Sequence, residues 1–163
     1  MDKIIGLNFA VLKYMEHDPK RIQHFTKVHA FAKLIGQREK IPEQDLFILE
    51  SAALLHDIGI KNAEAKYGTC TGKQQELEGP PEAEKILQTL EYKLEEIERI
   101  KYLIAHHHTY TNIQDLDYQI LVEADFLVNL YEDNCSKDAV VATKDKIFKT
   151  KCGKEILNLM FGV

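Results

Sequence analysis

The stretch of residues 51–60 constrains the fold most strongly, because an apolar run ends there in two polar side chains. Residues 52–55 read Ala-Ala-Leu-Leu, His56 and Asp57 follow directly, and Gly59 interrupts the pattern. The run predicts a buried helix, and an imidazole and a carboxylate carried into a core need a partner or a metal ion. Near the end of a helix the two side chains can converge, because the last turn is less regular. A His-Asp pair alone is a weak indication, so its weight depends on matching ligands elsewhere.

The composition is that of a globular domain. The chain has 163 residues, of which 45% are hydrophobic and 29% are charged, and this length allows a real core. We expect one domain over residues 1–163. Its motif-bearing core covers about 19–134, and a C-terminal helical extension covers 137–163.

The net charge of −5 limits the classes of partner. It argues against nucleic acid or an anionic membrane as the main partner. It permits a small phosphorylated substrate, because a bound cation can invert the local field. No apolar run approaches the roughly 18 residues of a membrane span, and the first residues lack a signal-peptide pattern. The three cysteines are widely spaced without a CxxC pair, which favours reduced thiols and a cytoplasmic protein.

Apolar residues recur at helical spacing through most of the chain, and no segment shows clear strand alternation. Asp18 and Pro19 form a helix-start signal, with Asp as the N-cap and Pro in the first helical position. The expected helices cover about 4–16, 19–37, 42–58, 80–90, 92–107 and 115–131, and two short helical patterns in 137–163 are separated near Gly153. The sequence therefore predicts an all-α fold.

Residues 61–79 differ from the rest, because they contain three glycines and no strong periodicity. We expect a loop there, which leaves directly from the His-Asp pair. Structureless loops longer than about 12–15 residues in a compact domain are usually functional or disordered. Two interpretations stay open, namely a lid that contacts the substrate and a solvated surface loop.

Two further polar residues lie on apolar helix faces. His24 shares its stripe with Val28, and Asp125 lies between Leu121 and Val128. A core histidine bonded to a neighbour is the alternative for His24, and a salt bridge or a backbone cap is the alternative for Asp125. A bare buried carboxylate is costly, so a cation is a physical reason to keep it there.

The candidate metal ligands are His24, His56, Asp57 and Asp125. Two imidazoles and two carboxylates suit Mn, Fe, Co, Ni, Zn or Mg in different degrees. Three consecutive histidines, residues 106–108, form a further candidate contact for metal or phosphate. Only one or two of them can face one point, and an exposed run without a partner is the alternative.

The order and spacing of these motifs resemble the HD-domain superfamily, the metal-dependent phosphohydrolases named for their His-Asp pair. The family pattern is an early His, then His-Asp, then a late Asp. The matching segments here are Arg21-Ile-Gln-His24-Phe-Thr-Lys-Val28, Ala52-Ala-Leu-Leu-His56-Asp57-Ile-Gly59 and Glu123-Ala-Asp125-Phe-Leu127. The intermediate Ile104-Ala-His106-His107-His108 resembles the histidine pair often found before the last motif.

The resemblance implies a single-domain helical bundle with one divalent metal ion held by His24, His56, Asp57 and Asp125. Typical activities of the family are hydrolysis of nucleoside monophosphates, other phosphomonoesters or phosphodiesters. The cation would polarise the phosphoryl oxygens and lower the pKa of a bound water.

The remaining site residues are assigned by the chemistry of a phosphate ester. Asp57 would orient or deprotonate the water. Phosphate charge needs cationic contacts, for which Arg21 and Lys61 are candidates, and His107 is a candidate acid or contact. The candidate catalytic residues are thus Asp57, His107 and Lys61, and the candidate substrate-binding residues are Arg21, Lys61 and His107. A solvated surface charge is the alternative for Arg21 and for Lys61.

The sequence departs from the family pattern in several places. Ile60 follows Gly59 where family members commonly have Lys, so the lysine is displaced to position 61. No histidine lies between His56 and His106, so a standard two-metal site is incomplete unless Glu82 or the histidine run substitutes. The Gly-Tyr-Pro signature of cyclic-dinucleotide phosphodiesterases is absent, and so is a GxxxxGK[ST] phosphate loop, which argues against an ATP-driven role.

Three classes of function follow. The leading hypothesis is a one-metal phosphohydrolase that acts on a small nucleotide or a related phosphate ester. The second is a non-enzymatic, metal-stapled module that binds a nucleotide or a partner protein. The third is an oxygenase-like enzyme with two irons, against which the missing histidine counts. The tail after Asp133 is also a candidate surface for a homodimer.

Overall fold

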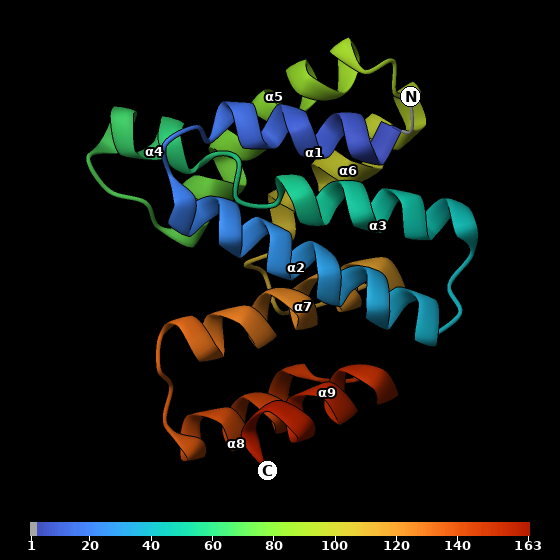
Figure 1. The fold of residues 1–163 in the computed structure, drawn as a ribbon, viewed down its shortest axis with the longest axis vertical. Coiled ribbons are helices and arrows are strands. Elements are labelled where there is room, and N and C mark those ends of the chain that lie inside the picture. Colours follow the sequence, from blue (N-terminus) through green and yellow to red (C-terminus); the bar gives the residue numbers. More distant parts are fainter. Residues whose placement is uncertain (1–2) are drawn as a thin grey trace.

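In the computed structural model, residues 3–163 are described, and they form nine α-helices without a strand (Figure 1). The prediction of an all-α fold is therefore confirmed. The helices are α1 (Lys3–Tyr14), α2 (Pro19–Arg38), α3 (Glu43–Leu55), α4 (Ile60–Tyr67), α5 (Gly72–Thr89), α6 (Leu94–His106), α7 (Leu116–Glu132), α8 (Lys137–Ile147) and α9 (Lys151–Phe161).

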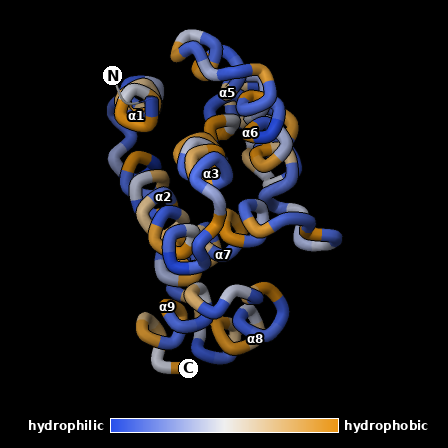
Figure 2. The backbone as a smooth tube through the Cα atoms, turned by 90° about the vertical axis from the view of Figure 1, so that its right-hand side faces the viewer, coloured by the Kyte–Doolittle hydropathy of each residue, from blue (hydrophilic) through white to orange (hydrophobic). Residues whose placement is uncertain are grey.

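Helix α3 occupies the centre of the bundle. Every residue from Ile48 to Leu55 is buried, and the helix packs against α1, α2, α6 and α7. A helix that is apolar on all sides is one that neighbours surround. Figure 2 shows α3 between α1 and α6, with α8 and α9 beyond α7. The buried hydrophobic residues form one cluster that runs from Leu7 in α1 to Leu157 in α9.

Helix caps explain where two of the helices begin. The Asp18 side chain accepts a hydrogen bond from the backbone N–H of Arg21 at 3.0 Å, and Pro19 follows the cap, as the sequence predicts. In the tail, Thr150 caps α9 by accepting from the N–H of Gly153 at 2.9 Å. The two short helices expected in 137–163 are therefore present, but the break between them lies at residues 148–150, because Gly153 belongs to the first turn of α9.

The expected loop at 61–79 is also wrong, because these residues belong largely to α4 and α5. Helix α5 begins at a capping box in which Thr71 accepts from the N–H of Gln74, and the Gln74 side chain accepts from the N–H of Thr71. Two backbone N–H groups that have no partner within the helix are hydrogen-bonded in this way. Pro80 and Pro81 lie inside α5 and do not open it. Contacts with α4 and α6 stabilise this glycine- and proline-containing helix.

The turn that leads into α4 packs closely against α5 at two glycines. A Cβ atom at Gly59 would lie 2.5 Å from the backbone N of Gly79 and 2.9 Å from the carbonyl C of Glu78. Because both obstacles are backbone atoms, a side-chain rotation cannot relieve the contact. The α3–α4 turn, which carries His56 and Asp57, therefore rests directly on α5.

We expect Gly59→Ala to lower the free energy of unfolding by about 1–3 kcal/mol, the usual cost of overpacking. Urea denaturation of both proteins measures the difference. Ala65→Ser on the exposed face of α4 is the control, with an expected change within about 0.5 kcal/mol. An unchanged midpoint for Gly59→Ala would mean that α4 and α5 separate without cost.

None of the helices in residues 3–163 combines the length and the apolar character that a membrane crossing requires.

Candidate metal centre

The His-Asp pair lies where α3 gives way to α4. Helix α3 ends at Leu55, and residues 56–59 form a tight turn before Ile60 begins α4. This turn brings the two side chains together, with Nε2 of His56 3.6 Å from Oδ2 of Asp57. The convergence expected for a pair at a helix end is therefore present.

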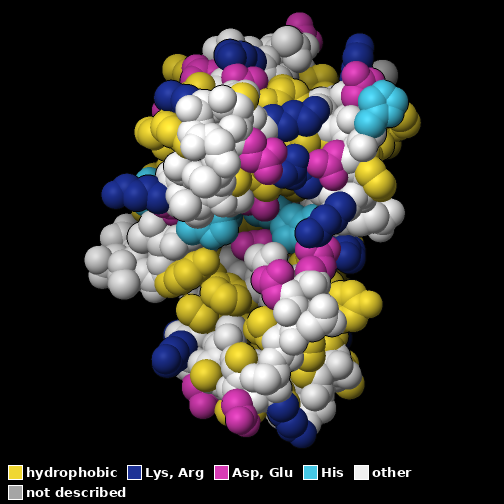
Figure 3. All heavy atoms as spheres, turned by 90° about the vertical axis from the view of Figure 1, so that its left-hand side faces the viewer, with side chains coloured by type: hydrophobic (Ala, Val, Ile, Leu, Met, Phe, Trp, Pro, Cys, Tyr) yellow, Lys and Arg dark blue, Asp and Glu magenta, His cyan; other side chains and the backbone are white. Residues whose placement is uncertain are grey.

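Two helices bring the other predicted ligands to the same point. Nε2 of His24 in α2 lies 3.1 Å from Nε2 of His56 and 3.6 Å from Oδ2 of Asp57. Oδ1 of Asp125 in α7 lies 3.3 Å from Nε2 of His24 and 3.5 Å from Nε2 of His56. The structure thus gathers all four predicted metal ligands into one cluster. Figure 3 shows histidine and acidic side chains around a hollow on one face of the molecule.

The backbone orients two of the imidazoles. Nδ1 of His56 lies 2.8 Å from the carbonyl O of Ala53, and Nδ1 of His107 lies 2.7 Å from the carbonyl O of Ile104. A carbonyl only accepts hydrogen bonds, so each Nδ1 carries the proton and donates it. The Nε2 atom of each ring then faces the cluster, and this is the atom through which either ring could ligate a metal ion.

The carboxylates stay ionised although they are buried. Burial raises the pKa of Asp57, but His56, His107 and His108 outweigh it and hold this pKa well below its ordinary value. For Asp125, burial likewise raises the pKa, and His24 and His56 lower it further than burial raises it. Ionised, buried carboxylates among imidazole nitrogens are a donor set that fits a divalent cation.

The cluster divides into two groups that share Asp57. Ligand atoms of His24, His56 and Asp57 lie within 4.8 Å of one another, and the same holds for Asp57, His107 and His108. In the second group, His107 and His108 of the histidine run stand in for the histidine that is missing between His56 and His106. Each group offers three ligands, which leaves room in a coordination shell for water or substrate.

The three consecutive histidines have different surroundings. Nε2 of His107 lies 3.1 Å from Oδ1 of Asp57, and Nε2 of His108 lies 3.8 Å from the same atom. His106 points elsewhere, because its Nδ1 contacts the carbonyl O of Tyr102 at 2.7 Å and its ring stacks on that tyrosine. Only His107 and His108 of the run therefore join the cluster.

Sequence reasoning missed Gln75, which lies in the first turns of α5. Its Oε1 contacts Nε2 of His108, and its amide nitrogen donates to Sγ of Cys70 at 3.3 Å. Glu76 accepts from the backbone N–H of His108 at 3.0 Å. Helix α5 thus fastens the end of the histidine run. The capping pattern at Thr71 was the one local signal for this helix.

The two predicted cationic contacts are placed differently. Arg21 borders a pocket of about 300 Å³ together with His24 and Asp57, but its guanidinium pairs with Asp18 at 3.0 Å and Glu64 at 2.5 Å. Lys61 is not brought to the cluster. Its amine donates to the carbonyl O of Tyr14 and lies 5.3 Å from the centre of that ring, because the first turn of α4 directs it toward the end of α1.

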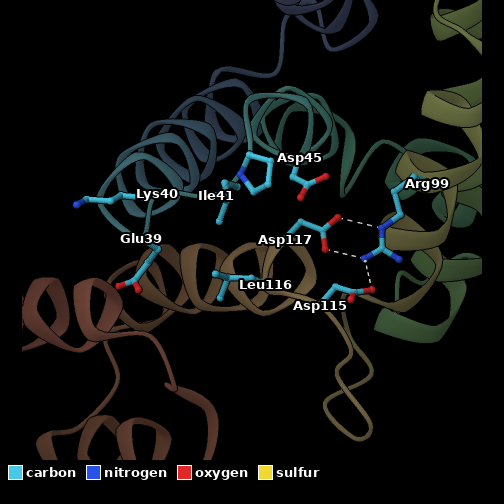
Figure 4. A pocket seen from close by; sticks show the side chains of 9 residues that line it. Glu39, Lys40, Ile41, Asp45, Arg99, Asp115, Leu116 and Asp117 are labelled. Carbon is cyan, nitrogen blue, oxygen red and sulfur yellow. Dashed lines mark hydrogen bonds and ion pairs between the residues drawn. The ribbon is translucent and has the colours of Figure 1, made fainter.

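Another pocket, of about 450 Å³, lies between the α2–α3 connection and the start of α7. Figure 4 shows Arg99 at its edge, bonded to Asp115 and Asp117. Oδ1 of Asp117 lies 2.6 Å from the guanidinium, and Oδ2 of Asp115 lies 3.1 Å from it. These carboxylates pair with the arginine, so its guanidinium is already engaged and is not directed at a phosphate.

The metal-free protein should lose stability as the pH rises from about 6.5 to about 9. Burial would lower the pKa of His24, but Asp125, Asp57 and Glu132 outweigh it and raise the pKa from 6.5 to about 9. The folded state holds this proton more tightly than the unfolded state. Protonated His24 therefore contributes its full stabilisation below pH 6.5, and this stabilisation is lost as the pH rises to about 9. Metal affinity should rise over the same interval, because the ion displaces the proton.

Thermal melting of chelator-treated protein at several pH values measures the first effect, and titration calorimetry measures the second. His24→Gln is the control and should flatten the pH dependence of melting in this interval. A wild-type melting temperature that stays constant between pH 6.5 and 9 would contradict the assignment.

Comparisons with known proteins agree with this geometry. The family model described as "HD domain" matches residues 21–143. The fold is similar to the crystal structure of a predicted HD superfamily hydrolase from an uncultured Thermotogales bacterium. That similarity has a TM-score of 0.66 and 24% sequence identity, and it covers 99% of this chain and 85% of the other. No curated protein matches the sequence. The family model matches three quarters of the chain, and the His, His-Asp and Asp residues of the sequence motifs meet at one point. The chain therefore belongs to the HD domain family.

Proposed function

We propose that this protein is a metal-dependent phosphohydrolase that acts on a small phosphate ester, with a nucleotide as the leading candidate. The observation that carries the proposal is the pair of His/Asp groups that share Asp57 beside a pocket. Ionised carboxylates at this point would repel a phosphate without a cation, so the geometry is useful for hydrolysis only when a metal is bound.

The first group together with Asp125 is the main site, where His24, His56, Asp57 and Asp125 would hold one divalent ion. When bound, the ion supplies positive charge that polarises a phosphoryl oxygen and makes water more acidic. Oδ1 of Asp57 is positioned to orient a water or to accept its proton. His107, 3.1 Å from that oxygen, either holds a second ion together with His108 or exchanges a proton with Asp57.

The pocket supports a small substrate. Its volume of about 300 Å³ is at the lower end for small-molecule sites. Its lining combines the cations Lys20 and Arg21 with four carboxylates, so a phosphate would need a bound cation there; the carboxylates are those of Asp18, Asp57, Glu132 and Asp133. Arg21 would have to exchange Glu64 or Asp18 for phosphate when it contacts the substrate. A nucleic acid is a less suitable partner, because the chain carries a net charge of −5.

One observation favours a second candidate function. The group of Asp57, His107 and His108 supplies ligands for a second ion next to the first, and a pair of irons at such a site could activate dioxygen. Oxygen consumption by the iron-loaded protein distinguishes this candidate from phosphate release by the manganese-, cobalt- or magnesium-loaded protein.

The direct test is metal content together with a phosphate-release screen. Purified protein is analysed for bound metal and assayed on nucleotides and other phosphate esters with Mn, Co or Mg. The same sample is then stripped with a chelator and reloaded. We expect at least one ion per chain, and phosphate release that disappears on stripping and returns on reloading. Bound metal without turnover on any phosphate ester would favour the metal-stapled binding module, and protein that never binds metal would refute the proposal.

A further inference from the structure

His24 differs from the other buried histidines of the cluster in what holds its Nδ1 atom. His56 and His107 use backbone carbonyls, which no substitution removes. Nδ1 of His24 lies 2.9 Å from Oε2 of Glu132, so a side chain alone fixes this ring. Since an ionised carboxylate only accepts hydrogen bonds, Nδ1 of His24 carries the proton and donates it to Glu132.

Glu132 is held in place from its other side. Its Oε1 accepts from Nζ of Lys27 at 2.6 Å, and its side chain is only 17% exposed. Lys27 lies one turn after His24 on the same helix, so α2 supplies both partners. Burial raises the pKa of Glu132, but Lys27 and His24 outweigh it and lower this pKa, which keeps the carboxylate charged.

The position of Glu132 in α7 also needs an explanation. It is the last residue of the helix, where the negative end of the helix dipole disfavours a carboxylate. Residues 125 and 132 are seven positions apart, about two turns, so they lie on the same face of α7. Asp125 faces Nε2 of His24 at 3.3 Å, and Glu132 faces Nδ1 at 2.9 Å. One helix thus holds the ring at both nitrogens.

We propose that Glu132 is a positioning residue of the metal centre. Its carboxylate fixes the tautomer and the ring plane of His24, directs Nε2 at Asp125 and His56, and makes that nitrogen a stronger ligand. A carboxylate bonded to the second nitrogen of a ligating histidine has both effects. Lys27 in turn holds the Glu132 carboxylate in place. The inference rests on the proposed metal-dependent function.

The test compares metal affinity in variants of two adjacent carboxylates. Glu132→Ala removes the acceptor, and Glu132→Gln keeps an oxygen for Nδ1–H but loses the charge. Asp133→Asn is the matched control, because Asp133 borders the same pocket but Glu132 is the carboxylate at Nδ1 of His24. The dissociation constants for Mn and Co are measured by titration of stripped protein, and the Co absorption spectrum reports the ligand geometry.

We expect Glu132→Ala to weaken metal binding about 10- to 100-fold, the usual effect of removing such a partner. Glu132→Gln should recover part of the affinity, because it keeps an acceptor for Nδ1–H but loses the charge, and Asp133→Asn should match the wild type. The Co spectrum should change in Glu132→Ala and return toward wild type in Glu132→Gln. Melting of the stripped proteins shows whether the Ala variant is folded at the temperature of the titration.

The outcomes separate the two proposals. A wild-type protein that binds no metal refutes the proposed function. A wild-type protein that binds metal, with equal affinity and an equal Co spectrum in all three variants, overturns the role of Glu132 alone. The role of Glu132 is also overturned when the Glu132→Ala, Glu132→Gln and Asp133→Asn proteins all bind metal equally weakly. The loss of affinity would then come from the loss of surface charge.

Discussion

Asp57→Ala is expected to abolish metal binding in both groups and to lower phosphate release by roughly 10³-fold or more. Oδ2 of Asp57 faces His24 and His56 at 3.6 Å, and Oδ1 faces His107 at 3.1 Å. No other residue belongs to both candidate groups in the described chain, 3–163. A metal ion contributes several kcal/mol to the stabilisation of a phosphoryl-transfer transition state, and each 1.36 kcal/mol corresponds to a factor of ten.

The measurement is metal content and initial rate on the best substrate of the wild-type screen. Asp57→Asn keeps the shape of the side chain but loses the charge, and we expect it to be nearly as defective. Asp45→Ala is the control, because Asp45 is an exposed carboxylate at the other pocket (Figure 4). Circular dichroism establishes that each variant is folded. Full metal content and full activity in Asp57→Ala would remove Asp57 from the centre.

The largest expected loss of stability is for Glu123→Ala, at about 3 kcal/mol. Glu123 is fully buried in α7, and its Oε1 accepts from the backbone N–H groups of Lys149 at 2.6 Å and Thr150 at 2.9 Å. Its Oε2 accepts from the Thr150 hydroxyl, and the Gln119 amide donates to Oε1 at 2.8 Å. Without the carboxylate, the two backbone donors at the start of α9 lose their partner, and each such loss costs about 1–3 kcal/mol.

Thermal and urea unfolding measure this effect, and for a chain of this size the melting temperature should fall by about 6–12 °C. Glu155→Ala is the control, because Glu155 is exposed and pairs with Arg38 at 3.1 Å, a type of contact that contributes little. A Glu123→Ala protein as stable as Glu155→Ala would mean that water replaces the carboxylate between α7 and α9.

The helices that could be predicted from the sequence are those in which apolar residues recur at helical spacing. Helices α2 and α7 have apolar faces that His24 and Asp125 interrupt with polar groups, and His56 directly follows the buried run that ends α3. A polar side chain on an apolar face is visible in the sequence, because burial and helical period together fix its direction. The convergence of the four predicted ligands rests on this local information combined with the family pattern.

The parts that sequence reasoning did not recover depend on contacts between distant residues. Helix α4 buries only Ile60 and Ala63, and α5 contains glycines and prolines, so their propensities are poor and packing decides their structure. The contact of Gln75 with His108 joins residues 33 positions apart. Lys61 was expected near phosphate from its position after the pair, but the first turn of α4 determines where it points.

The four candidate ligands of the main site come from segments far apart in the chain, since His24 and Asp125 are separated by about a hundred residues. A cation bound there would act as a reversible crosslink between α2, the α3–α4 turn and α7. The unfolded chain cannot hold its ligands in this arrangement, so binding and folding are thermodynamically linked. At a free ion concentration of a hundred times the dissociation constant, this linkage would stabilise the folded chain by about 2.7 kcal/mol. The supply of metal would then influence how long the protein survives proteolysis as well as whether it turns over substrate.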